Sequence, residues 1–208
     1  MELAETLGVS RTVIRDALSN LENAGFVERV RGIGTVINRG IVSIDSRLDL
    51  KLEYNDMIAA TGHRPVIDSI ALRAEKASAA VAEHLHLEPG KEVAVCHKRV
   101  LADDRPVIYS IDYIPLELFG RTNYALLDWS EPVFDLLSRC CGLNVLSSIA
   151  NVSAVSGNDL VSSKLELPPQ TPLLLLEEVS FCRMKRPVLY SLGYYTDFFS
   201  FTLLRKKF

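Results

Sequence analysis

Residues 3–37 read LAETLGVSRTVIRDALSNLENAGFVERVRGIGTVI, and this stretch predicts a helix-turn-helix followed by a two-stranded hairpin. Residues 2–7 favour a short helix, after which a Gly-Val pair provides a turn. Ser10 is suited to cap a second helix that runs to about Ala24, and Gly25 ends it. Two short helices separated by a tight turn are typical of a DNA-binding motif.

The second helix has an apolar stripe and a polar face. At 100° per residue, the apolar positions recur with the helical spacing i, i+3, i+4, i+7. They are Ile14, Ala17, Leu18 and Leu21. The polar positions gather away from that stripe, and they are Arg11, Thr12, Arg15, Ser19 and Glu22. We expect one face to pack and the other to meet a groove of DNA.

Two strand-like segments follow the helix, at residues 26–31 and 35–38. They are joined by Gly32-Ile33-Gly34, whose glycines permit a tight reversal and a close approach of the backbone to a phosphate. This pattern predicts the wing of a winged helix-turn-helix.

The whole of residues 3–37 resembles the GntR family of bacterial regulators in the spacing of turn, helix and wing. The resemblance implies that Ser10, Arg11, Thr12 and Arg15 enter the major groove of operator DNA. It also implies that Arg31, Gly32 and Gly34 lie along the minor groove or the backbone. Arginine pairs with two acceptors of guanine, and serine or threonine binds phosphate. The alternative interpretation is a solvated helix face that carries two arginines.

The chain departs from the family at its start, because family members usually carry a further helix before this motif. We therefore expect a partial DNA-binding domain whose first helix is missing. The apolar side chains of Leu3, Leu7, Ile14 and Leu18 would then lack a packing partner, and DNA binding would be weak or absent.

Composition describes a globular chain of 208 residues, with 48% hydrophobic and 24% charged residues. This length suits a medium domain plus a small one. The sequence contains no run of 18 apolar residues and no signal-peptide pattern, so we expect no membrane segment and a cytoplasmic location. The net charge of −3 means that positive charge must be placed locally for DNA binding.

The four cysteines have no CxxC spacing and no histidine in metal-ligand register, so we expect buried thiols and neither metal nor cofactor. They are Cys96, Cys140, Cys141 and Cys182.

The predicted organisation is a winged helix-turn-helix at residues 1–40, a partly extended linker at 41–52 and a larger domain at 53–208. The larger domain contains a repeat, because RPVIYSIDY at 105–113 returns as RPVLYSLGY at 186–194. A helix-like segment, a Pro-containing turn and a strand-like run precede each copy. The helical segments are 77–85 and 158–165, the strands are 93–101 and 173–181, and a further helix is expected at 131–141.

Two such units predict an α+β fold with a mostly antiparallel sheet. The order of segments resembles the UTRA domain, the effector-binding half of the HutC subfamily of GntR regulators, over about residues 52–205. The resemblance rests on the paired P-V-x-x-S strands, on the run at 173–177 after a Pro-rich turn, and on the closing segment 199–205. It implies a chorismate-lyase-like fold.

Alternation along the repeated strands places Ser110 and Asp112 on one face, with Ser191 equivalent to Ser110. Lys98 and Glu178 occupy equivalent positions of the preceding strands. They could hold a ligand or each other in a shared cleft, or they could form a solvated pair. If they are buried, each charge needs a partner.

By resemblance, UTRA domains that bind sugar phosphates carry arginines at the positions of Lys98, Val100 and Glu178, and a glutamate at that of Ser110. They also use a serine at Pro132 and the amide end of a helix at Tyr54-Asn55. This chain lacks the arginine pair suited to phosphate. This lack of positive charge favours a neutral or amine-bearing effector, together with Glu178, Asp112 and the aromatic cluster Tyr194, Tyr195, Phe198 and Phe199.

The sequence thus predicts a ligand-responsive bacterial transcription regulator, more specifically a repressor, that acts as a homodimer on operator DNA. One alternative is a metabolite-binding dimer that does not bind DNA. The other is a lyase-type enzyme on the same fold, for which the four histidines offer no catalytic arrangement, so we expect no enzymatic activity.

Overall fold

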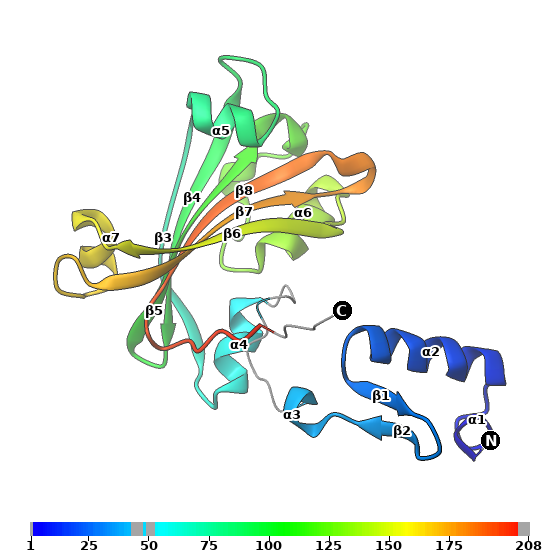
Figure 1. Ribbon diagram of the computed structural model, residues 1–208. Helices are drawn as coiled ribbons and strands as arrows, with labels where there is room; N and C mark the ends of the chain where they lie inside the picture. The colour runs from blue at the N-terminus through cyan, green and yellow to red at the C-terminus, as the bar shows by residue number, and fades with distance from the viewer. Residues whose placement is uncertain (1, 43–47, 49–52, 204–208) are drawn as a thin grey trace. The chain divides into compact units, whose positions relative to one another are not determined.

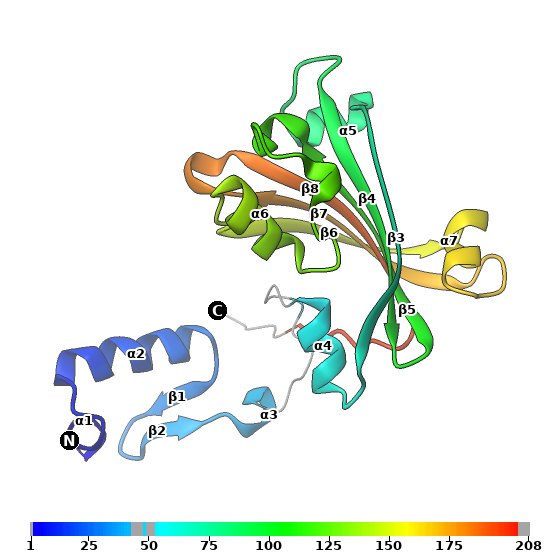
Figure 2. The same ribbon diagram turned by 180° about the vertical axis from the view of Figure 1, so that it is seen from behind.

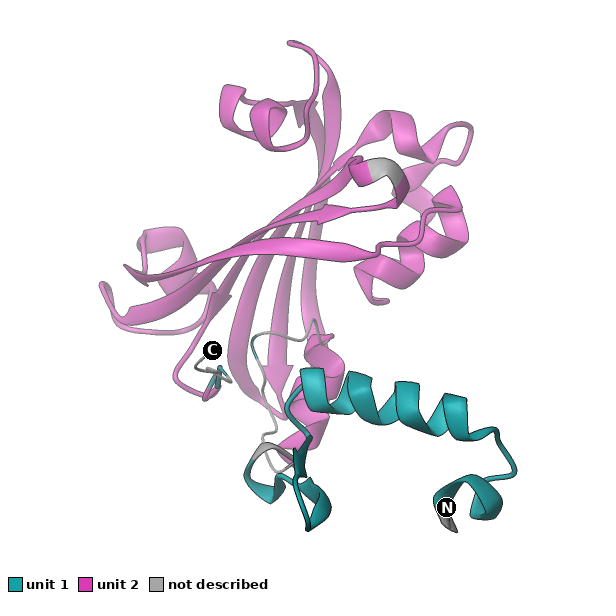
Figure 3. Cartoon of the chain, turned by 45° about the vertical axis from the view of Figure 1, so that its right-hand side comes forward, with its two compact units in different colours: residues 1–50, 201–208 teal, residues 51–200 magenta. Residues whose placement is uncertain are grey.

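A computed structural model describes residues 2–42, 48 and 53–203 of the chain. The chain divides into two compact units, coloured separately in Figure 3. The first comprises residues 1–50 and 201–208, and the second comprises 51–200. Most of the predicted linker at 41–52 lies outside the described residues.

The first unit holds the predicted helix-turn-helix and hairpin (Figure 1). Its elements are α1 (Glu2–Thr6), α2 (Arg11–Asn23), β1 (Val27–Val30), β2 (Gly34–Ile37) and α3 (Arg39–Val42). Ser10 caps α2 as expected, because its hydroxyl accepts a hydrogen bond from the backbone N–H of Val13 at 3.3 Å. The short helix α3 extends into the predicted partly extended linker at 41–52, so that expectation was wrong for residues 41–42.

Part of the polar face of α2 contacts the hairpin. Arg29 of β1 donates a hydrogen bond to the Ser19 hydroxyl at 2.8 Å, and its backbone N–H donates to Glu22 at 3.1 Å. These two members of the predicted DNA-facing set therefore fix β1 against α2. Arg11, Thr12 and Arg15 are exposed and lie nearer the start of the helix.

The second unit is a six-stranded antiparallel sheet in the order β3-β4-β5-β8-β7-β6. Its strands are β3 (Pro65–Lys76), β4 (Glu92–Ala102), β5 (Arg105–Pro115), β6 (Ser147–Ser156), β7 (Pro172–Phe181) and β8 (Pro187–Tyr195). Its helices are α4 (Tyr54–Ala60), α5 (Ala79–His84), α6 (Val133–Cys141), α7 (Asp159–Lys164) and the 3-10 turns η1 (Leu116–Phe119), η2 (Tyr124–Leu126) and η3 (Arg183–Lys185). The expected α+β fold with an antiparallel sheet is confirmed.

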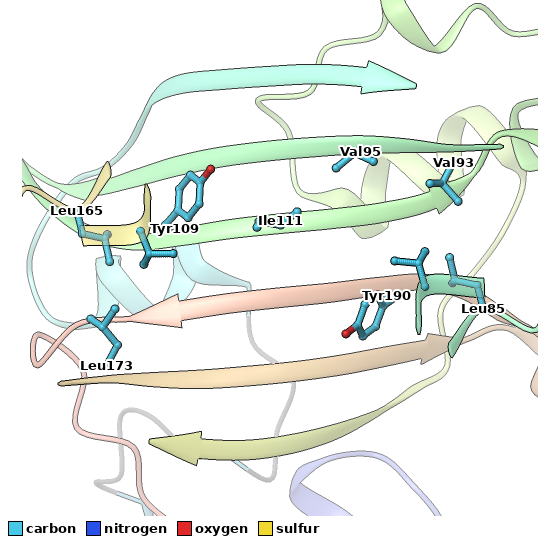
Figure 4. Close-up of a cluster of buried hydrophobic side chains, with 10 residues drawn as sticks. Leu85, Val93, Val95, Tyr109, Ile111, Leu165, Leu173 and Tyr190 are labelled. Atoms are coloured by element: carbon cyan, nitrogen blue, oxygen red, sulfur yellow. The ribbon is translucent and has the colours of Figure 1, made fainter. Parts of the chain in front are cut away.

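Alternation gives the sheet two faces with different cover. The tyrosine face carries Tyr109 and Tyr190, and α5 and α7 pack on it near different ends of the sheet (Figure 1), with Leu85 and Leu165 among the buried side chains in Figure 4. The serine face, named for Ser110 and Ser191, is covered by the segment from η1 to α6 (Figure 2). A buried cluster on this face contains Trp129, Leu136, Leu137 and Leu189.

The register places the two repeats around the central strand pair. Ile111 lies opposite Leu192, and the flanking pairs are Ser110 with Gly193 and Asp112 with Ser191. The repeat relates Ser110 to Ser191 and Asp112 to Gly193, so each flanking pair is the counterpart of the other. The polar centre of the sheet is consequently asymmetric, because one repeat supplies a carboxylate where the other supplies no side chain.

The repeating unit is longer than the sequence predicted. A long strand precedes each helix, β3 before α5 and β6 before α7, so the unit is strand, helix, strand, strand. Both added strands form the edges of the sheet. An edge strand buries little, so its sequence lacks the continuous apolar run that marks β4 and β7.

Candidate functional site

The residues predicted to contact DNA are exposed in the first unit. Arg11, Thr12 and Arg15 lie on the first turns of α2. The Arg15 guanidinium is 3.5 Å from Asp16, an exposed contact that competes only weakly with a phosphate. Ser10 caps the helix and retains its hydroxyl proton for a further acceptor.

The turn of the hairpin has the backbone that the glycines predicted. Gly32 has φ +82° and Gly34 has φ +109°, a region that disfavours side chains. Arg31 is exposed beside them. A groove of about 520 Å³ lies beside α2. It is lined by Leu3, Ala4, Arg11, Ile14, Arg15, Leu18 and Arg29. Leu3 is 55% exposed and Leu7 62%, whereas Ile14 and Leu18, expected to lack a packing partner as well, are half-buried.

A cavity on the serine face brings together most of the predicted ligand contacts. Those that line it are Tyr54, Lys98, Ser110, Asp112, Glu178, Ser191 and Tyr195. The remaining predicted contact, Asn55, is half-buried in the first turn of α4 and does not belong to the lining of this cavity. Residues from four strands, one helix and the start of α6 therefore converge at one place.

Lys98 is the most deeply buried charge of the cavity, with 1% of its surface exposed. Its ammonium group donates a hydrogen bond to the backbone carbonyl of Glu131 at 3.2 Å, just before α6. The register places Lys98 beside Ser110 and Glu178 beside Ser191, so their predicted equivalence is confirmed. A solvated pair is excluded, because Glu178 is only 7% exposed.

Three carboxylates line the same cavity as Lys98. Asp112 is 6% exposed and accepts a hydrogen bond from the Ser191 hydroxyl at 2.8 Å. Glu178 on β7 lies opposite Ser191 on β8. Glu53, the residue that precedes α4, also lines the cavity. Lys98 thus shares the cavity with two buried carboxylates and the half-buried Glu53, and buried charges are costly unless opposite charge or hydrogen-bond donors compensate them.

Two tyrosines give the cavity its aromatic walls. The Tyr54 hydroxyl is buried and has no hydrogen-bond partner among the described residues, so it is available to a ligand. Burial raises the pKa of Tyr54, and nearby Asp112 adds to that effect. The pKa of Tyr195 is also raised, by burial and then by the charges of Glu178 and Asp112. Both hydroxyls therefore stay protonated and can donate.

Tyr195 narrows the cavity by lying over Gly193. A Cβ atom at position 193 would be 2.8 Å from Cε2 of the Tyr195 ring, which is packed edge-on to Phe199. The remaining space is about 50 Å³, enough for water and too little for a metabolite. A ligand of ordinary size would require side chains of the lining to move.

The sequence did not identify several members of the lining. Glu53, Val133, Phe134, Leu189 and Gly193 complete the cavity. The comparison of the two repeats could have singled out Gly193, because the first repeat has Asp112 at the equivalent position. Nothing in the sequence pattern marked Glu53 or the α6 residues, which come from segments distant along the chain.

The histidines and cysteines form no metal site within the described residues, where no group of three potential ligands occurs. Of the four cysteines only Cys96 is fully buried, so the expectation of buried thiols was correct for one and too strong for the three half-buried ones. Burial raises the pKa of the Cys96 thiol to about 12. In the described part of the chain, no helix has the length and apolar character needed to cross a membrane.

Comparison with known families gives two matches. Residues 60–197 match the UTRA domain, and residues 1–37 match the family described as bacterial regulatory proteins, gntR family. The two matches cover most of the second unit and the helix-turn-helix with its wing.

Comparison with known proteins gives relatives of the same kind. The HTH-type transcriptional regulator GgaR of Escherichia coli is 25% identical over 93% of this chain and 75% of its own length. The HTH-type transcriptional repressor NagR of Bacillus subtilis is 24% identical over 86% and 72%, respectively. The solved structure of the possible transcriptional regulator YydK from Bacillus subtilis has a TM-score of 0.70 at 18% identity, covering 99% of this chain and 87% of that one, which supports the fold.

Proposed function

The chain belongs to the GntR family of bacterial regulators and carries the UTRA domain of that family, and we propose that the cavity on the serine face is the site where it senses its effector. It is a ligand-responsive transcription regulator. The observation that carries the proposal is the convergence of three buried ionisable side chains, Lys98, Asp112 and Glu178, on one cavity. Buried charges are costly to a fold and are concentrated at functional sites.

The charge of the cavity supports a neutral or amine-bearing effector over a sugar phosphate. Asp112, Glu178 and Glu53 outnumber Lys98, and the lining contains no arginine for bidentate binding of phosphate. A ligand ammonium group placed near the Asp112–Ser191 pair would compensate the excess negative charge. The Tyr54 hydroxyl and the Tyr195 ring would hold the uncharged part.

A thermal-shift screen with amines, nucleosides and sugar phosphates tests this proposal, since a ligand that binds only the folded chain raises the melting temperature. For an amine that binds, Asp112→Asn should weaken affinity at least tenfold, and the exposed control Asp104→Asn should not. Tight binding of an anionic sugar phosphate that is lost in Lys98→Ala would overturn the assignment of effector class.

For DNA, we propose that Ser10, Arg11, Thr12 and Arg15 read the major groove and that the turn at 31–34 contacts the backbone. Their exposure and the glycine geometry of the turn support this role. In a salt-dependent gel shift with operator DNA, Arg15→Ala should weaken specific binding by about 1–3 kcal/mol. The matched control is Arg121→Ala, which removes an exposed arginine of the second unit. Equal binding by wild type and Arg15→Ala would remove Arg15 from the interface.

We further propose a cytoplasmic homodimer that represses transcription and has no catalytic role. A twofold dimer matches a pseudo-palindromic operator, and effector binding would favour a conformation with lower affinity for DNA. The competing proposal is a metabolite-binding dimer that does not bind DNA. Effector binding without any salt-sensitive gel shift would select that second function.

A further inference from the structure

A second hollow, of about 230 Å³, lies on the tyrosine face, behind the strands that carry the effector cavity. Its lining consists of Ser69, Ala71, Arg73, His97, Arg99, Tyr109, Leu160 and Lys164. We propose that this hollow binds a small oxyanion, a carboxylate or phosphate group, at Arg73, Tyr109 and Lys164. The proposal concerns a different site from the effector cavity and does not depend on it.

The charge of the lining is the first argument. Arg73, Arg99 and Lys164 contribute positive charge, and no carboxylate belongs to the lining. The carboxylates next to the hollow, Glu75, Asp68 and Glu166, contact Arg73 or Arg99 from outside the lining. In the effector cavity, by contrast, carboxylates belong to the lining itself.

The direction of the hydrogen bonds is the second argument. Arg73 contacts Nε2 of His97 at 2.6 Å, and Nδ1 of His97 contacts the Tyr109 hydroxyl at 2.7 Å. Arginine can only donate, so Nε2 must accept and Nδ1 must carry the proton. Tyr109 then accepts from His97, and its own hydroxyl proton is left for another acceptor. Burial and the nearby Arg73 lower the pKa of His97, consistent with its neutral form.

The other groups at the hollow are donors as well. Lys164 is half-buried at the end of α7, and its ammonium group has no hydrogen bond or ion pair with any described residue. Ser69 adds a hydroxyl from β3. A ligand that only accepts hydrogen bonds and carries negative charge fits this set, and an oxyanion has both properties.

Arg99 has a positioning role. Its guanidinium is bonded to both oxygens of Asp68 and to Glu166 at 2.9 Å, and it donates to the backbone carbonyl of Lys164 at 3.3 Å. These bonds fix the end of α7 against β4 and so hold Lys164 over the hollow. Arg73 donates through Nε to Glu75 at 2.7 Å and through Nη1 to His97 at 2.6 Å. Its Nη2 group has no hydrogen bond to the described residues and can donate to a ligand while the bond to His97 is kept.

The test is calorimetric titration of the full chain with inorganic phosphate and, separately, with acetate, in a low-chloride buffer. Lys164→Gln and Tyr109→Phe should each raise the Kd at least tenfold, because the first removes a positive charge and the second removes a hydroxyl donor. Lys76→Gln removes a lysine from the same strand as Arg73 on the serine face and should leave the Kd unchanged. Since Lys164 lies at the half-exposed end of a helix, its variant should fold even if Tyr109→Phe does not.

Two results would overturn the proposal. One is the absence of binding of either anion at millimolar concentration. The other is binding that is weakened by Lys98→Ala and retained by Lys164→Gln, which would place the anion in the effector cavity. Loss in Lys164→Gln with retention in Lys98→Ala would establish the hollow whatever the effector proves to be.

Discussion

Replacing Gly193 by alanine tests the closed state of the effector cavity. The new Cβ would be 2.8 Å from Cε2 and 3.4 Å from Cζ of Tyr195, and 3.4 Å is the lower end of ordinary van der Waals contact. The ring must therefore move by about 0.6 Å or more against Phe199, which it contacts edge-on. Overpacking of this kind costs about 1–3 kcal/mol. We expect the free energy of unfolding to fall by that amount.

Urea unfolding followed by the fluorescence of Trp129, the single tryptophan of the chain, measures this cost. If the clash is with the Tyr195 ring, Gly193→Ala should cost much less in a Tyr195→Ala background, giving a coupling energy of about 1 kcal/mol or more. Effector affinity should also fall in the single variant, because the methyl group enters a space of about 50 Å³. Additive effects of the two substitutions would refute the account in which Tyr195 closes the cavity over Gly193.

Three further predictions concern other parts of the molecule. Arg29→Ala should loosen the hairpin from α2 by removing the side-chain hydrogen bond to Ser19 and the 3.4 Å ion pair with Glu22, seen as faster amide exchange in β1 with unchanged exchange in the second unit. Cys96, whose pKa is raised to about 12 by burial, should resist a thiol reagent in the folded chain at pH 8 while the half-buried cysteines react; labelling of Cys96 at a rate like theirs would contradict its burial. His97 has a pKa lowered by burial and by Arg73, so its contribution to stability is full above pH 6.5 and is lost as the pH falls toward its folded value. Wild type should therefore lose more stability than His97→Gln between pH 7.5 and 5, and parallel curves would remove His97 as the source.

The centre of the fold could be predicted because burial leaves a clear pattern. The repeated strands β5 and β8 are buried on both faces, so their sequences retain the same succession of apolar, tyrosine and serine positions. The register follows from that pattern, since a slip of one residue would exchange the two faces. This is why the equivalence of Lys98 and Glu178 could be inferred before their burial was known.

The edges of the sheet could not be predicted in the same way. In β6, Ile149 and Val152 are 64% and 45% exposed, so alternation carries no information about an inner face. In β3, a bulge between Ile67 and Ser69 interrupts the period. The sequence of an edge strand is constrained by one neighbour instead of two.

The candidate site was predictable only where its residues lie on the repeated strands. The family resemblance pointed to Tyr54, but the buried state of its hydroxyl depends on how α4 folds back over the sheet. Glu53 and Phe134 enter the cavity by similar long-range packing. Tertiary contacts of this kind have no periodic signal in the chain.

The placement of the two hollows on opposite faces has a consequence for regulation. His97 and Lys98 are neighbours on β4, and Tyr109 and Ser110 are neighbours on β5, so each strand presents one residue to the oxyanion hollow and the next to the effector cavity. A shift of either strand that opens one site must move donors of the other. Coupling between binding sites is reciprocal, so an anion that changes effector affinity by a given factor must have its own affinity changed by the same factor.

The test measures the Kd of the effector with and without phosphate, and the Kd of phosphate with and without the effector. In wild type the two ratios of Kd values should be equal. In Lys164→Gln phosphate should no longer change the Kd of the effector, because it no longer occupies the hollow. If phosphate still changes the Kd of the effector in Lys164→Gln, it acts through another site.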